Sequence, residues 1–182
     1  MPNWTFNTIR VSGNKEHIAK MMNDAIKNEN GEMTLRSWFP IPETFLKYDT
    51  TNHPNGERLV VGEEYWDGLG HRGIMTAELL DEYKQATKEQ RETYGVVGWY
   101  DYNCKYFGCK WSDCDVKIAD EMDGKIVLST DTPWTSPDMW LIRLSERYPD
   151  LLFENHAEFE DGFWQDTSFS KGFYSNEGEG GD

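Results

Sequence analysis

Residues 4–11 read WTFNTIRV, and residues 12–26 continue as SGNKEHIAKMMNDAI. Aromatic and β-branched side chains dominate the first stretch, which predicts a β-strand. Its even-numbered aromatic residues and its odd-numbered aliphatic residues point to opposite faces, so we expect a strand that is covered on both faces or that contains a bulge. Asn14 is a suitable N-cap, and apolar residues then recur at helical spacing. The chain therefore opens with a strand followed by an amphipathic helix.

Three further segments complete a regular pattern. Residues 115–131 alternate apolar and polar side chains around an Asp-Gly pair, which predicts a β-hairpin. Residues 135–148 predict a helix, because Pro137 suits the first helical position and Pro149 ends the helix. Residues 151–160 alternate again as a strand. The order strand, helix, hairpin, helix, strand is the split βαββαβ pattern. We therefore predict an α+β, ferredoxin-like fold, an antiparallel sheet with two helices on one face.

A long, glycine-rich stretch separates the first helix from the hairpin. We expect one ferredoxin-like domain over residues 1–175, with an inserted loop and helix lobe at about residues 38–98. Within the insertion, Thr76 is a suitable N-cap for a helix that runs to about Tyr94. Residues 176–182 read NEGEGGD and predict a flexible, acidic, glycine-rich tail.

The composition excludes several classes of protein. A net charge of −15 would repel a nucleic-acid backbone, so we expect no direct nucleic-acid binding. An aromatic content of 14% is too high for a disordered acidic tail. No apolar run is long enough for a membrane helix, and no signal peptide is apparent at the start. These features predict a soluble, cytoplasmic protein with no membrane partner.

Most of the negative charge lies in the last part of the chain. Residues 111–182 contain 17 acidic and 5 basic residues. Along the predicted last strand, Glu154, Glu158 and Glu160 fall on the same side as His156. Alternate residues of a strand are about 6.6–7 Å apart, close to every second phosphate of a nucleic-acid strand. These glutamates form a candidate binding face for a basic protein surface, and a merely solvated acidic surface is the competing interpretation.

A second candidate site lies in the aromatic stretch at residues 98–111. Trp99, Tyr102 and Trp111, with Lys110 and Arg72 as cations, could stack against a base or a nucleotide. The competing interpretation is that these aromatic side chains belong to the core, as strand aromatics ordinarily do, with the lysine extending to solvent.

The chain contains no recognisable catalytic or phosphate-binding motif. His53 and His71 lie near carboxylates in the insertion but lack the spacing of a metalloenzyme, so we interpret them as loop residues. Cys104, Cys109 and Cys114 are five residues apart, unlike the closer pairs of zinc sites, and we interpret them as reduced packing residues. We therefore predict no enzyme activity, no cofactor and no metal.

Three groups of residues carry a resemblance to a known family. They are Pro2, Asn3, Trp4, Asn7 and Gly13; Trp99, Asn103, Gly108, Lys110 and Trp111; and Gly162 with Trp164 after the late acidic strand. Together they resemble the YubB-like proteins of plasmids, phages and other mobile elements, although Cys109 replaces the threonine usual in the central motif. The resemblance implies a ferredoxin-like domain and a bacterial or phage source, and it implies no activity.

These observations lead to one functional prediction and one alternative. We predict a non-catalytic phage or plasmid accessory protein that acts by binding, for example a counter-defence inhibitor that engages a basic surface of a host or phage protein through its acidic face. The alternative is a protein that binds or sequesters a small ligand such as a nucleotide, through the cluster around Trp99–Trp111.

Overall fold

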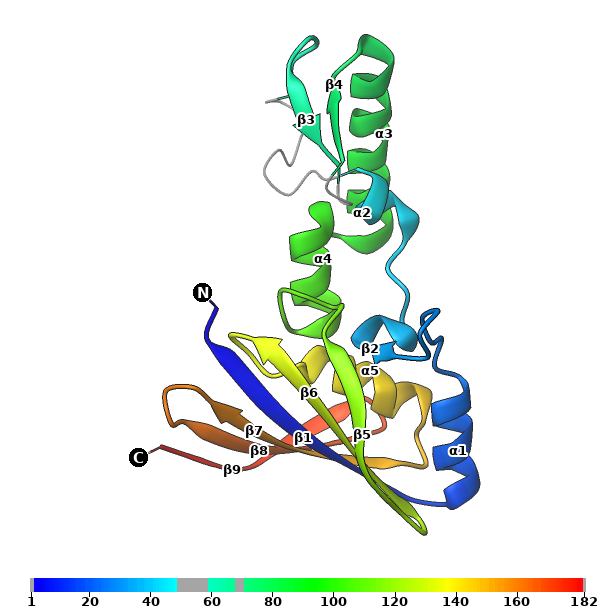
Figure 1. The fold of residues 1–182 in the computed structure, drawn as a ribbon, viewed down its shortest axis with the longest axis vertical. Coiled ribbons are helices and arrows are strands. Elements are labelled where there is room, and N and C mark those ends of the chain that lie inside the picture. Colours follow the sequence, from blue (N-terminus) through cyan, green and yellow to red (C-terminus); the bar gives the residue numbers. More distant parts are fainter. Residues whose placement is uncertain (1, 49–58, 68–70, 182) are drawn as a thin grey trace. The chain divides into compact units, whose positions relative to one another are not determined.

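The computed structural model describes residues 2–48, 59–67 and 71–181. The chain forms two compact units, one made of residues 1–40 and 106–182 and the other of residues 41–105. The fold is α+β, with a large antiparallel sheet and several helices (Figure 1).

The larger unit carries the sheet. Its described elements are β1 (Trp4–Ser12), α1 (Lys15–Asn23), β2 (Met33–Thr34), η1 (Leu35–Ser37), β5 (Asp115–Met122), β6 (Lys125–Pro133), α5 (Asp138–Arg147), β7 (Leu152–Phe159), β8 (Trp164–Ser170) and β9 (Phe173–Gly180). Among the described residues the sheet has seven strands in the order β2-β5-β6-β1-β7-β8-β9. Strand β1 lies between β6 and β7 and is antiparallel to both (Figure 1).

Strand β1 is covered on one face only. Thr5, Asn7, Ile9 and Val11 are buried, whereas the residues that alternate with them are exposed or half-buried. The prediction of a strand that is covered on both faces or contains a bulge is therefore wrong, since one face is exposed and the pairing of β1 with β6 and β7 has no register shift. The apolar pattern changes phase because the buried face carries two polar residues at one end, while Phe6 remains 44% exposed on the other face.

Two tryptophans link α1, η1 and α5. Trp38 and Trp140 are almost fully buried, and their rings meet edge to face with centroids 5.6 Å apart. The indole of Trp38 donates a hydrogen bond to the Met21 carbonyl in α1, and that of Trp140 donates to the Leu35 carbonyl. Each ring thus buries apolar surface, and its only polar group, the indole N–H, is hydrogen-bonded.

The chain end is ordered as a strand. Residues 176–180 belong to β9 and pair with β8, in place of the flexible tail predicted for residues 176–182. Gly178 and Gly180 lie against the indole of Trp164, and a Cβ on Gly180 would come within 3.0 Å of that ring. The glycines that look like a loose tail in the sequence therefore make room for a neighbouring aromatic ring.

The smaller unit is mainly helical. It contains α2 (Glu43–Lys47), β3 (Glu64–Trp66), β4 (Arg72–Ile74), α3 (Ala77–Tyr94) and most of α4 (Gly98–Phe107). The predicted helix is confirmed: the Thr76 side chain accepts a hydrogen bond from the Leu79 N–H, and Gly95 ends the helix in a left-handed conformation with φ 68°. Much of the aromatic stretch at 98–111 is helical, whereas its aromatics were interpreted as strand residues. In the part of the chain that is described, no helix is long and apolar enough to cross a membrane.

Candidate functional site

In the described part of the larger unit, one face of the sheet is lined by exposed and half-buried side chains, and we call it the open face. It consists of the side chains of β1, β6, β7 and β8 that alternate with the buried ones. Strand register places them in three rows, namely Asp131–Phe6–Glu158–Trp164, Ser129–Thr8–His156–Asp166 and Val127–Arg10–Glu154–Ser168. In the first row, carboxylates and aromatic rings alternate across four strands.

The structure brings two of the three predicted glutamates onto this face. Glu154 and Glu158 are exposed and lie on the same side of β7 as His156. Glu160 is also exposed, but it lies in the turn after β7 and not on the strand as predicted. The strand ends at Phe159, whose N–H already bonds the Phe163 carbonyl across the turn.

His156 is held between two carboxylates. Its Nδ1 lies 2.6 Å from an oxygen of Asp166, and its Nε2 lies 3.1 Å from an oxygen of Glu158. The hydrogen bond to Asp166 raises the pKa of His156 above its usual range, with a further contribution from Glu158. The Trp164 ring lies beside the imidazole, with centroids 6.2 Å apart. The centre of the open face thus favours a protonated histidine, because each ring nitrogen faces an acceptor.

We expect this arrangement to make stability depend on pH. Because the pKa of folded His156 is raised, its pairing stabilises the fold fully below the ordinary value of 6.5 and loses that contribution as pH rises through the raised pKa. The variant Asp166→Asn should lower the pKa of His156 in an NMR titration and flatten the pH dependence of Tm in this range. The control is Asp150→Asn. Asp150 lies near His17 and not near His156, so this variant should leave the His156 titration unchanged. A titration of His156 that is the same in Asp166→Asn and wild type would contradict this account.

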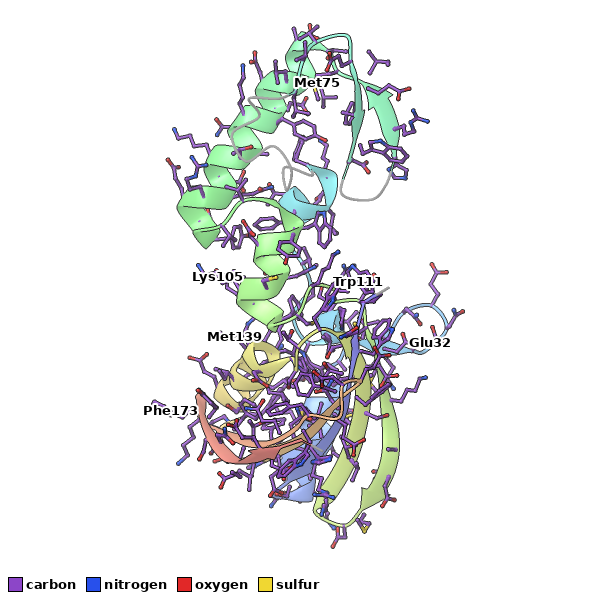
Figure 2. All side chains as sticks on the ribbon, turned by 90° about the vertical axis from the view of Figure 1, so that its left-hand side faces the viewer. Glu32, Met75, Lys105, Trp111, Met139 and Phe173 are labelled. Carbon is purple, nitrogen blue, oxygen red and sulfur yellow. The ribbon has the colours of Figure 1, made fainter. Side chains whose placement is uncertain are left out.

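Three tryptophans gather where β1 begins and β6 ends. The ring of Trp111 (Figure 2) lies 5.9 Å from that of Trp4 and 6.1 Å from that of Trp134, centroid to centroid. The Lys110 ammonium lies 5.5 Å from the Trp111 ring and 5.0 Å from the Trp134 ring. Trp134 has a φ of 64°, a strained conformation for a bulky residue, and is 46% exposed. The cluster shows that these rings can accept a cation.

The alternative ligand site is divided between the two units. Lys110 and Trp111 belong to the larger unit, whereas Trp99, Tyr102 and Arg72 belong to the smaller one. Tyr102 is 4% exposed, and its ring centroid lies 4.4 Å from that of Phe45, as expected for a core residue. Trp99 is half-buried beside Tyr100. Arg72 pairs with Glu64 and lies 5.1 Å from the Trp66 ring.

The remaining candidate residues are the histidines and cysteines that were considered as metal ligands. His53 lies outside the described residues, and His71 pairs with Asp67 at 2.9 Å. Cys109 is buried, whereas Cys104 and Cys114 are half-buried, and none of the three forms a disulfide within the described residues. Within the described ranges there is no group of three or more histidines, cysteines or carboxylates suited to a metal ion.

Sequence reasoning missed four open-face residues: Phe6, Asp131, Trp164 and Asp166. The alternation of each strand was visible, but the register that aligns these residues with Glu158 depends on pairing between distant segments. A sequence signal could have identified Phe6, because its even position differs from the odd positions of the buried Ile9 and Val11.

Comparison with known proteins bears on the fold. No family model matches the chain, and no curated protein matches it. A solved structure, that of a protein api92 from Yersinia pseudotuberculosis described by the family model DUF1281, is similar to it with a TM-score of 0.50 and 9% sequence identity. The match covers 100% of this chain and 98% of that one. At this identity the likeness concerns the fold alone.

Proposed function

We propose that this chain is a non-catalytic binding protein whose open face engages a basic surface of a partner protein. The observation that carries the proposal is the row Asp131–Phe6–Glu158–Trp164, in which exposed aromatic rings alternate with carboxylates. An arginine side chain can stack on such a ring and pair with the neighbouring carboxylate at the same time. Aromatic anchors on an accessible surface are also typical of protein interfaces.

The charge of the open face favours a basic protein over a nucleic acid. Phe6 could stack against a base, but Asp131 and Glu158 flank it on the two adjacent strands. Across the three rows, Arg10 and the paired His156 are the cationic groups, against Asp131, Glu154, Glu158 and Asp166. Phosphates brought to Phe6 would therefore be repelled.

The proposal extends to the fold class and the origin. The strand order β5-β6-β1-β7, with α1 and α5 as connections, supports a ferredoxin-like core to which β2, β8 and β9 are added. The resemblance to YubB-like proteins supports a plasmid or phage protein that acts in the cytoplasm of a bacterial host. A counter-defence role fits this proposal, because an acidic face could occupy a nucleic-acid groove on a host protein.

Binding of three fluorescent probes at several salt concentrations tests the proposal. The probes are labelled nona-arginine, a ten-residue thymidine oligonucleotide and ATP. We expect nona-arginine to bind at low ionic strength, its affinity to fall steeply with salt, and the other two probes to remain unbound. Binding of ATP or the oligonucleotide without binding of nona-arginine would refute the proposal, and ATP binding would favour the nucleotide site at Trp111 and Lys110.

A further inference from the structure

A groove of about 360 Å³ lies where two strands of the sheet separate. Strand β5 is paired with β6 from Lys117 onward, opposite Ser129, but its first residues pair with β2 instead. The divergence leaves space between the start of β5 and the end of β6, next to Trp4 and Trp111. All the residues that line this groove belong to the larger unit.

The walls combine aromatic rings with carboxylates. Trp4 and Trp111 form an aromatic side, and Asp113, Asp115 and Asp131 are exposed around it. Asp131 also belongs to the first row of the open face, directly opposite Phe6, so the groove continues that face. Tryptophan rings with carboxylates nearby are the usual surroundings of a bound organic cation.

Three cations lie near these side chains. Lys117 lines the groove, the Arg36 guanidinium lies 4.0 Å from Asp113, and the Lys110 ammonium lies 5.5 Å from the Trp111 ring. Asp115 and Asp131 take part in no ion pair within the described part of the chain. The residues that line the groove include three aspartates and one lysine, so the lining has a net negative charge.

The groove also has a neighbouring thiol that responds to this charge. Burial is the main cause that raises the pKa of Cys114; Asp113, Asp115 and Asp131 add to it, and Arg36 opposes it, with a resulting pKa of about 12. A negative potential that disfavours a thiolate favours a cation in the same place.

We propose that this groove, lined by Trp4, Trp111, Asp115 and Asp131, is the subsite that receives an arginine side chain of the basic partner. The inference rests on the proposed function, since it names the residue type that the open face recognises. A guanidinium is planar, stacks on tryptophan and donates to carboxylates in a fixed geometry, whereas an ammonium is more strongly hydrated. The volume is near the lower end of the 300–1,000 Å³ range of ligand sites, which suits one long side chain better than a nucleotide.

The test uses the peptide acetyl-Gly-Arg-Gly-amide and its neutral citrulline analogue. The indole N–H signals of Trp4 and Trp111 are assigned by Trp→Phe variants and followed by NMR at millimolar peptide. We expect the arginine peptide to shift both signals and the citrulline peptide to leave them in place. Equal shifts with the two peptides, or no shift with either, would overturn the inference.

Variants separate the groove from the rest of the open face. Asp115→Asn with Asp131→Asn should weaken arginine-peptide binding at least fivefold, whereas Glu89→Gln with Glu92→Gln removes the same charge from exposed positions of α3 and should change it less than twofold. An unchanged Tm in both double variants would show that they remain folded. If nona-arginine binding depends on Glu154 and Glu158 but not on Asp115 and Asp131, the subsite is refuted and the proposed function stands. If it depends on neither pair, both are refuted.

Discussion

Replacing Asn7 with alanine is expected to lower the free energy of unfolding by about 3 kcal/mol, because the change leaves several buried polar groups without partners. The Asn7 amide donates to the carbonyls of Thr5 and Thr130 and to the hydroxyl of Thr132. Its oxygen accepts a hydrogen bond from Asn155 Nδ2 at 3.1 Å. One side chain thus joins β1 to both of the strands that flank it.

The loss should spread beyond β1. Asn155 also donates to the Ser136 hydroxyl, which in turn donates to Asp138 at the start of α5. Burial raises the pKa of Asp138, and the hydrogen bond from Ser136 opposes that rise. Networks of this kind are costly when only partly satisfied.

Urea unfolding followed by far-UV circular dichroism measures the effect. Thr8→Ala is the matched control, since Thr8 neighbours Asn7 on the same strand but is exposed on the open face. We expect it to change stability by less than about 0.5 kcal/mol. Equal losses in the two variants would show that the buried network does not stabilise the sheet.

The second large effect concerns binding. Reversing the charge of Glu154 and Glu158 with lysine should weaken nona-arginine binding by roughly tenfold or more at low salt, equal to about 1.4 kcal/mol or more. The two glutamates lie on either side of His156 on β7, so four units of charge change at the centre of the open face. Because both side chains are exposed, the double variant should remain folded.

A charge-matched control separates site-specific recognition from the effect of net charge. Glu89→Lys with Glu92→Lys makes the same change on exposed positions of α3, and it should weaken nona-arginine binding less than threefold. Anisotropy titrations of wild type and both doubles, repeated at high salt, measure the difference. Similar losses in the two doubles would mean that the acidic residues act only through overall charge, and the solvated-surface interpretation of Glu154 and Glu158 would then hold.

Local patterns determined the type of most elements. The helix Ala77–Tyr94 is predictable because its cap residues, Thr76 and Gly95, act within one helical turn of its ends. The hairpin of β5 and β6 is predictable for the same reason, since its turn and its alternation are contiguous in sequence. Side chains of a strand alternate between its two faces, and this alternation alone was enough to place Glu154 and Glu158 on the same side of β7.

Tertiary structure decided which side of each strand is buried and what lies beside it. Period-two alternation separates the two faces of β1, but the burial of Asn7 depends on hydrogen bonds to residues more than 120 positions away. Likewise, Asp131 and Trp164 join Phe6 and Glu158 in one row only through strand register. The groove exists because β5 leaves β6 to pair with β2. Such features depend on contacts between segments that are distant in sequence. A local pattern cannot predict which of these contacts form, because their free energy depends on both segments.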